Sequence, residues 1–349
     1  MTPTTAVAQV LDRAREATQP KMREAVDRLV PSIRDVVSYH LGWTEVDGRP
    51  ADVRGGKGIR PALAMLSAEA AWAAPEIGVP GGVAVELVHN FSLIHDDLMD
   101  GDRERRHRPT VWALWGPGMA ILAGDALANL ATEVLLTSGN SANAAAAASA
   151  LGAATAEMIA GQADDLAFEK RQVVSVEECM AMSTAKTGAL LGCAASIGAI
   201  LAGAPVATVR ALRDFGRHIG VAFQAVDDLF GIWGDPLTTG KPAGNDIRQR
   251  KKSMPIVAAL GAGDDEAKEL GAILFAPEDA APPPFGGLSA EQVARATWLV
   301  EACGGREWTA DRAKAHLDSA LACLERARLS AVPRRALADL AVYVVERES

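Results

Sequence analysis

Residues His89 to Thr110 read HNFSLIHDDLMDGDRERRHRPT and form the most informative stretch of the chain. In its first half, apolar residues recur at intervals of three and four, which is typical of a helix with one buried face. The helix is expected to end at Asp100, because Gly101 and a run of charged residues follow. Three acidic residues, Asp96, Asp97 and Asp100, close it. A long helix that ends in carboxylates is therefore the unit to look for elsewhere.

The same spacing recurs along the chain and predicts an all-α protein. Aromatic residues make up only 5% of the sequence, and Ala, Leu, Val and Gly dominate, which favours helices packed closely through small residues. A length of 349 residues would suit two domains. No linker separates halves of different composition, however, so we expect one domain over residues 1–349, a single large helical bundle. Residues 1–20 are expected to be a loosely ordered N-terminal segment, and residues 276–288 a Pro-rich loop.

Ten helices are expected from the apolar spacing, separated by Gly- and Pro-rich breaks. Their ranges are Met22–Leu41, Arg60–Ala74, Gly82–Asp100, Met119–Ser138, Ala142–Glu169, Ser175–Ala202, Val206–Gly231, Ser253–Gly261, Ser289–Cys303 and Asp311–Arg326.

Charge and composition exclude several classes of protein. The chain carries 35 Lys and Arg against 44 Asp and Glu, a net charge of −9, which disfavours nucleic-acid binding. The N-terminus lacks the apolar run of a signal peptide, and the four cysteines form no Cys-x-x-Cys pair, so a cytoplasmic protein with reduced thiols is expected. Residues 187–209 are uncharged and nominally long enough to span a bilayer. Because Ala and Gly dominate them, a buried central helix is expected and no stable membrane insertion.

The helix that ends at Asp100 presents its acidic residues on one face. At 100° per residue, Asp96 and Asp100 project within about 40° of each other, and His89 and Ser92 share that face. Two like charges 4 Å apart repel by about 4 kcal/mol at an effective dielectric constant near 20. Cations are therefore expected to bind there.

A second acidic pair, Asp227 and Asp228, follows Gln224 late in another apolar helix. A single Asp-Asp pair is most often a solvated helix end. Two such ends, each accompanied by basic loops, favour hard divalent cations, which prefer carboxylate oxygens and share their coordination with substrate phosphates. The two ends are expected to face each other across the mouth of a bundle.

Basic clusters alternate with the acidic ones along the chain. They comprise Lys57 and Arg60 in a Gly-rich loop, the run 103–108, Lys186, Lys241 and the run 248–252. The loop does not match the P-loop pattern, which needs Gly-Lys-Ser/Thr between a strand and a helix. Alternating acidic and basic clusters in a helical chain predict a metal-bridged diphosphate site with a separate, metal-free anion site nearby.

Six motifs, in this order, resemble those of the trans-isoprenyl diphosphate synthases, the polyprenyl synthetase family. They are GGKGIRP at 55–61, the stretch 89–110, GQADD at 161–165, KTG at 186–188, FQAVDD at 223–228 and GDPLTTGKPAGND at 234–246. The resemblance extends from about Met22 to Pro255. It implies an isoprenoid synthase bundle around a central cavity, and a short-chain prenyltransferase that joins isopentenyl diphosphate to an allylic diphosphate. It also implies a homodimer.

The resemblance implies roles for individual residues. Three Mg²⁺ ions would be held, two by Asp96, Asp97 and Asp100 and one by Asp227 and Asp228. The allylic diphosphate would contact Arg105, Lys186, Lys241 and Lys251, isopentenyl diphosphate would contact Lys57, Arg60, His89 and Arg106, and Thr187 and Gln224 would lie beside the carbocation.

This chemistry needs those residue types. Breaking an allylic carbon–oxygen bond leaves negative charge on diphosphate, which metal ions and cationic side chains stabilise. The second anion site holds the double bond that captures the carbocation. Diphosphate is the expected proton acceptor, so no nucleophilic triad is needed.

Two positions depart from the family pattern. Gly231 stands where the second acidic motif usually has a third Asp, and weakened but retained binding of one ion is expected. A metal titration, alone and after Gly231→Asp, would test this. His107 occupies a position that is commonly Gly, and the sequence suggests no function for it.

In the family that the chain resembles, product length depends on bulk at the fourth and fifth residues before the first aspartate, which in this chain are Ser92 and Phe91. A single aromatic residue there resembles synthases that make geranylgeranyl diphosphate (C20), with farnesyl diphosphate (C15) as the alternative. Plain core packing of Phe91 explains the residue equally well.

Other functions stay open. A class I terpene cyclase would use similar acidic motifs but would not need the second anion site. A non-catalytic prenyl synthase subunit would be expected to lose aspartates that this chain keeps.

Overall fold

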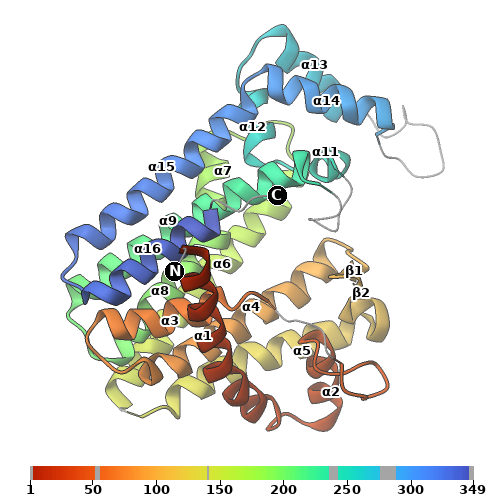
Figure 1. The fold of residues 1–349 in the computed structure, drawn as a ribbon. Coiled ribbons are helices and arrows are strands. Elements are labelled where there is room, and N and C mark those ends of the chain that lie inside the picture. The colour runs from red at the N-terminus through yellow and green to blue at the C-terminus, as the bar shows by residue number, and fades with distance from the viewer. Residues whose placement is uncertain (1–2, 52–55, 140, 236–242, 276–287, 346–349) are drawn as a thin grey trace. The chain divides into compact units, whose positions relative to one another are not determined.

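The computed structural model describes residues 3–51, 56–139, 141–235, 243–275 and 288–345. Over these residues the chain is helical apart from loops and two strands of two residues each, so the all-α prediction is confirmed (Figure 1). Two compact units can be distinguished, each built from segments far apart in the sequence. The first comprises Met1–Thr155, Leu190–Gly216 and Ala322–Tyr343, and the second comprises Ala156–Ala189, Arg217–Leu321 and Val344–Ser349. The single domain over residues 1–349 stays a prediction.

The first unit is organised around the helix that carries the first acidic motif. That helix, α4 (Val79–Met99), packs against α5 (Val111–Leu136) and α3 (Ile59–Ala70), as Figure 1 shows. The unit also contains α1 (Pro3–Val26), α2 (Pro31–His40), the 3₁₀ turn η1 (Pro75–Gly78), strands β1 (Glu104–Arg105) and β2 (Arg108–Pro109), nearly all of α8 (Ala189–Leu201) and most of α16 (Ala331–Val345).

Small residues let the helices of this unit approach closely. A Cβ atom added at Gly198 of α8 would lie 1.9 Å from the carbonyl oxygen of Ala64 in α3. A Cβ at Gly81 of α4 would lie 2.6 Å from Ile197. These helices therefore touch almost backbone to backbone, which is the packing that a sequence rich in Ala and Gly predicts.

The N-terminus corrects one expectation. Residues 1–20 were expected to be loosely ordered, but α1 begins at Pro3 and buries Val7 and Leu11 against the unit. The helix expected over residues 22–41 is divided as well, because α1 ends at Val26 and Pro31 starts α2. A proline lacks the amide hydrogen that would continue the preceding helix.

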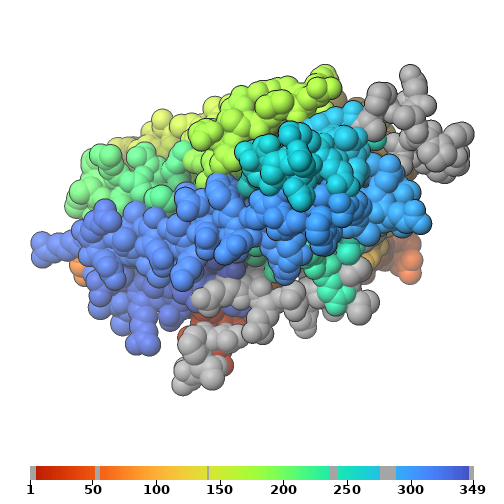
Figure 2. Space-filling view, turned by 90° about the horizontal axis from the view of Figure 1, so that it is seen from above, coloured from red at the N-terminus to blue at the C-terminus, as the bar shows by residue number. Residues whose placement is uncertain are grey.

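The second unit gathers the residues around the second acidic motif. It contains the C-terminal parts of α6 (Ser141–Glu169) and α9 (Val206–Trp233), most of α15 (Gly305–Arg326), α7 (Val176–Ser183), the π-helical turn η2 (Thr184–Gly188), α11 (Asn245–Arg248), α12 (Met254–Leu260), α13 (Asp265–Leu274) and α14 (Ala290–Ala302). Helices α13 and α14 lie side by side, α13 cyan and α14 blue in Figures 1 and 2. Their core includes Leu270, Leu274 and Leu299.

Four helical segments are long and apolar enough to cross a membrane, judged by length and composition alone: Pro75–Met99, Val111–Leu136, Ser141–Glu169 and Val176–Leu201. The last contains most of the uncharged stretch considered above. In this segment 67% of the most apolar window is buried, and residues 188–199 are buried throughout. The expected buried central helix is therefore present up to Leu201.

Candidate active site

The acidic end of α4 separates an outward-facing pair of carboxylates from a buried one. Asp96 is half-buried and Asp100, the C-cap residue, is exposed. Asp97 is only 2% exposed, and its carboxylate accepts a hydrogen bond of 2.7 Å from Nε of Arg105. Burial raises the pKa of Asp97 to about 6, although Arg105 acts in the opposite direction. Asp97 thus anchors Arg105, while Asp96 and Asp100 remain accessible.

A strained hairpin presents the arginines that follow. Strands β1 and β2 pair antiparallel, and the two residues between them, Arg106 and His107, have φ of 53° and 61°. Positive φ at both positions is the pattern of a type I′ turn, which favours Gly and Asn. This backbone conformation explains why glycine suits the position of His107, which is exposed here. The strain is retained at the site that displays Arg106.

A cationic cluster lies next to this hairpin in the first unit. The charges of Arg60 and Arg106 act on both Glu86 and His89, which are neighbours on one face of α4. Burial raises the pKa of Glu86, and it lowers the pKa of His89 well below its usual value, so His89 is neutral at pH 7. A Cβ atom at Gly56 would lie 3.7 Å from both Arg106 Nη2 and Glu86 Oε1. The Gly-rich loop therefore reaches the cluster through its backbone.

Lys57, the other predicted ligand in this loop, is exposed, with Nζ 6.0 Å from the centre of the Tyr343 ring. The structure thus brings Arg60, His89 and Arg106 together around Glu86. Their roles as ligands stay predictions. Glu86 was missed by the sequence interpretation, although it lies three residues before His89 and so on the same helix face.

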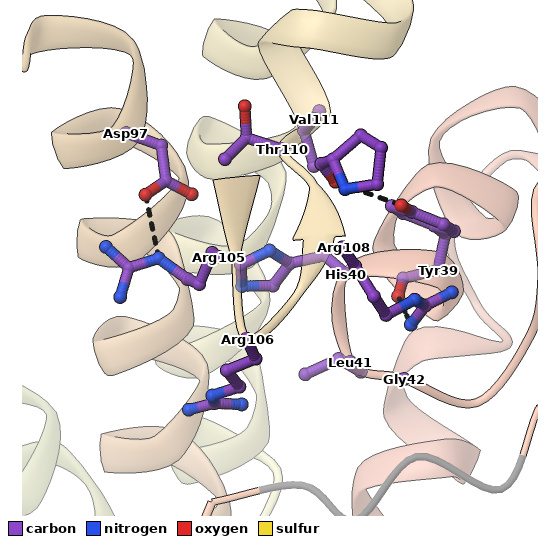
Figure 3. A pocket seen from close by; sticks show the side chains of 11 residues that line it. Tyr39, His40, Leu41, Gly42, Asp97, Arg105, Arg106, Arg108, Thr110 and Val111 are labelled. Carbon is purple, nitrogen blue, oxygen red and sulfur yellow. Dashed lines mark hydrogen bonds and ion pairs between the residues drawn. The ribbon is translucent and has the colours of Figure 1, made fainter. Parts of the chain in front are cut away.

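A pocket adjoins this cluster on the α2 side (Figure 3). It is lined by Tyr39, His40, Leu41, Gly42, Asp97, Arg105, Arg106, Arg108, Pro109, Thr110 and Val111. Arg108 has a structural role, because it donates hydrogen bonds to the carbonyl oxygens of Tyr39 and Thr44. Arg105 and Arg106 supply the other positive charges. No motif in the sequence pointed to the α2 residues of this pocket.

The acidic end of α9 in the second unit has the same division. Asp227 is exposed, whereas Asp228 is 8% exposed. Oδ1 of Asp228 accepts a hydrogen bond of 2.8 Å from Nε2 of Gln224, and Oδ2 accepts one of 2.8 Å from the backbone amide of Met254. Oε1 of Gln224 in turn accepts a hydrogen bond of 2.8 Å from Thr187. The predicted residues Thr187, Gln224 and Asp228 therefore form one hydrogen-bonded chain.

The π-helical turn η2 positions Lys186 and Thr187. A π-helical turn is rare and is often found at functional sites. The ammonium group of Lys186 pairs with Asp165 of α6. A Cβ atom at Gly161 would lie 2.4 Å from the backbone nitrogen of Lys186, so only glycine lets α6 approach η2 this closely. In the GQADD motif, Gly161 thus allows the close approach of η2, and Asp165 pairs with Lys186. The sequence did not reveal these two roles.

Gly231 is explained by a neighbouring acid. A Cβ atom at this position would lie 2.4 Å from Oδ2 of Asp246, which is itself 9% exposed. The carboxylate of Asp246 therefore occupies the space into which a side chain at 231 would extend. Burial, followed by the charge of Asp246, raises the pKa of Asp228 to about 7. A side chain at position 231 would therefore require Asp246 to move.

The remaining predicted residues are placed as follows. Lys251 is exposed and its backbone amide donates to the carbonyl oxygen of Asp246, whereas Lys241 lies outside the described residues. Phe91 is 8% exposed and meets the ring of His95 edge-on at 4.9 Å between centroids. Ser92 donates to the carbonyl oxygen of His89, within α4.

No three His, Cys, Asp or Glu side chains among the described residues form a ready metal site. The accessible carboxylates of Asp96, Asp100 and Asp227 nevertheless offer the hard oxygen donors that Mg²⁺ prefers, and Mg²⁺ in proteins commonly completes its shell with substrate phosphates and water. The donors at each acidic end therefore suit an ion that is held together with a diphosphate.

Comparisons with known proteins show the family of this chain. Residues 51–281 match the model of the family described as polyprenyl synthetase. The chain is 48% identical over 340 residues to a (2E,6E)-farnesyl diphosphate synthase of Mycobacterium bovis, covering 97% of this chain and 93% of the relative. It is 41% identical over 315 residues to a geranylgeranyl diphosphate synthase of Mycobacterium tuberculosis, covering 90% and 88%.

Among solved structures, a polyprenyl synthetase from Streptomyces coelicolor A3(2) superposes with a TM-score of 0.92 at 53% identity, covering 97% of this chain and 99% of that one. The fold is accordingly the all-α isoprenoid synthase fold. From its motifs, its fold and these relatives, the chain belongs to the polyprenyl synthetase family and is a prenyl-transferring enzyme.

Proposed function

We propose that this enzyme condenses isopentenyl diphosphate with an allylic diphosphate and that its main product is geranylgeranyl diphosphate. The observation that carries the proposal is the cluster of Arg60, Arg106 and the neutral His89 on α4, the helix that ends in the first acidic motif. His89 precedes Asp96 by seven residues, which is roughly 10 Å along a helix. One helix thus serves a metal-free anion site and a metal-binding end, as two diphosphate substrates require.

The first diphosphate is assigned to the acidic ends. We propose that Asp96 and Asp100 on α4 and Asp227 on α9 ligate Mg²⁺ together with the allylic diphosphate, with Asp97 and Asp228 in support. When bound, Mg²⁺ would neutralise the charge that develops on the leaving diphosphate. Arg105 and Lys186, held by Asp97 and Asp165, would point donors at the same group. Lys241 and Lys251 are proposed to contact it as well.

The second diphosphate is assigned to Lys57, Arg60, His89 and Arg106. Holding isopentenyl diphosphate there would place its double bond about 3–3.5 Å from the allylic carbon, the separation at which reacting atoms are well oriented. The hydroxyl and amide of Thr187 and Gln224, fixed by Asp228, would lie beside the carbocation. The proton lost after condensation would pass to the released diphosphate.

The product length rests on α4. Phe91 is buried one helical turn before His95, where it could close the floor of the chain pocket. Farnesyl diphosphate is the second candidate product, because the relative that is 48% identical over 97% of the chain is named as a farnesyl diphosphate synthase.

A cytoplasmic homodimer is also proposed. Helix α5 carries four exposed apolar side chains, Leu114, Ile121, Leu122 and Leu136, with exposed fractions of 39% to 56%. An apolar helix face that the monomer leaves open is typical of a subunit interface. Sedimentation equilibrium of the purified protein would test this, with Ile121→Glu expected to shift it toward a monomer.

Product analysis is the decisive test of function. The enzyme would be incubated with isopentenyl diphosphate, Mg²⁺ and either dimethylallyl, geranyl or farnesyl diphosphate, and the dephosphorylated alcohols separated by chromatography. Linear alcohols of 15 or 20 carbons support the proposal and identify the product. Cyclic hydrocarbons formed without isopentenyl diphosphate would indicate a cyclase, and the absence of any product would indicate a non-catalytic subunit.

A further inference from the structure

One polar atom in the pocket of Figure 3 has no partner. Nε2 of His40 is buried and makes no hydrogen bond to any described residue. Buried polar atoms normally have hydrogen-bond partners, and leaving one without costs free energy. An unpartnered polar atom that lines a pocket is a candidate for a hydrogen bond to a bound ligand.

The backbone around His40 is held firmly without any help from its side chain. His40 is the last residue of α2, which ends in a Schellman turn through Gly42, with φ of 75°, and a hydrogen bond from the amide of Trp43 to the carbonyl oxygen of Ser38. Arg108 donates to the carbonyl oxygens of Tyr39 and Thr44, on either side of His40. The imidazole is thus aimed by its surroundings, while its own Nε2 bonds to nothing described.

The pocket around the imidazole favours an anion. In Figure 3 the ring lies between the side chains of Arg105 and Arg108. Burial, followed by the charges of Arg105 and Arg106, lowers the pKa of His40 to about 3. The ring is therefore neutral at pH 7, and a neutral imidazole with the proton on Nε2 can donate one hydrogen bond to a phosphate oxygen.

His40 lies on the side of the second anion site. Its ring interacts with Asn90 of α4, and its charge state is coupled to that of His89. Asn90 precedes Asp96 by six residues, roughly 9 Å along the helix. This level of α4 belongs to the cluster of Arg60, His89 and Arg106 and not to its acidic end.

We propose that His40 is a further ligand of isopentenyl diphosphate, donating from Nε2 to an oxygen of its diphosphate group. The inference rests on the proposed function, because it assumes that this cluster holds that substrate. None of the six motifs that resemble the family includes residue 40. His40 thus adds a second imidazole, from α2, to the one that His89 supplies from α4.

Two substitutions at the same position separate a ligand from a packing role. Gln can place an amide hydrogen near the position of Nε2, whereas the shorter Asn reaches only the position of Nδ1. His40→Asn is expected to raise the KM for isopentenyl diphosphate about 10-fold or more, since losing a hydrogen bond to a charged group costs about that factor. His40→Gln is expected to recover most of it. The KM for the allylic substrate should change less than 2-fold in both.

The control is His107→Asn, at an exposed position whose positive φ asparagine tolerates. Calorimetric titration with isopentenyl diphosphate alone, and a thermal melt of each variant, complete the set. An unchanged KM and binding constant in His40→Asn would overturn the proposal, as would equal rises for both substrates. If the unmodified enzyme binds isopentenyl diphosphate but condenses nothing, the proposed function fails while the titration still decides the role of His40.

Discussion

The two acidic helix ends share one design and differ in how they stabilise the buried acid. In each pair the first aspartate, Asp96 or Asp227, faces outward, and the second, Asp97 or Asp228, is buried. Asp97 is paired with the guanidinium of Arg105, whereas Asp228 receives neutral donors from Gln224 and Met254 and has Asp246 as a neighbour. The pKa of Asp228 accordingly rises to about 7, against about 6 for Asp97. Each motif of two adjacent aspartates thus contains one accessible carboxylate and one that is buried in the protein.

The largest effect is expected from the outward acids. Asp96→Asn and Asp227→Asn should each lower kcat by about 10²–10³, the loss typical of removing one stabilising group from a transition state. Their melting temperatures should change little, because neither residue is fully buried. Steady-state kinetics with saturating Mg²⁺, alongside thermal melts, would measure both. Exposed Asp35→Asn on α2 is the matched control. If Asp96→Asn or Asp227→Asn lowers the melting temperature strongly but leaves kcat unchanged, the distinction between outward and buried aspartates is wrong.

Replacing Gly231 by the Asp that is usual in the family is expected to harm this enzyme. Since the carboxylate of Asp246 lies where a side chain would begin, Gly231→Asp should destabilise the protein by about 1–3 kcal/mol, as overpacking does, and lower activity roughly 10-fold. The double variant Gly231→Asp with Asp246→Gly transfers the carboxylate and should regain stability. Urea unfolding and a Mg²⁺ titration would check both variants. A single variant that gains metal affinity at full stability would show that Asp246 moves aside easily.

The two buried acids should respond differently to pH. Because the folded state raises the pKa of Asp228 from 3.8 to about 7, its protonated form stabilises the fold at low pH, and this contribution is lost as the pH rises through 7. Asp228→Asn removes that dependence and should be more stable than the parent at pH 8 without Mg²⁺, by about 4 kcal/mol at most. Asp97→Asn should not gain in the same way, since it leaves the Arg105 charge without its partner. Denaturant unfolding at pH 5 and pH 8 would measure the free energy of unfolding of both variants. If Asp228→Asn and Asp97→Asn change with pH in the same way, the two buried acids do not differ as proposed.

The comparison of the two acidic ends also shows which parts of the fold and of the site can be predicted from the sequence. The helices, both acidic ends and the group of Arg60, His89 and Arg106 follow from apolar spacing and from motifs, because these depend on residues close together in the chain. Contacts between distant segments could not be predicted. The examples are Asp246 filling the space at Gly231, Gly161 admitting η2, and His40 reaching the pocket from α2.

The smallest effect on rate, and the sharpest on product, is expected at Phe91. This ring is buried against His95, whose Nε2 lies 3.2 Å from the carbonyl oxygen of Ile121, so His95 connects α4 to α5. Each added isoprene unit buries about five carbons, worth on the order of 4 kcal/mol, so elongation continues until a side chain blocks it. Phe91→Ala should therefore lengthen the main product by at least one unit with only a few-fold change in kcat. Phe91→Leu, which keeps most of the bulk, should leave the length unchanged, and chromatography of the alcohols would read out both. If Phe91→Ala loses stability but keeps its product, Phe91 is a core residue and the floor of the pocket lies elsewhere.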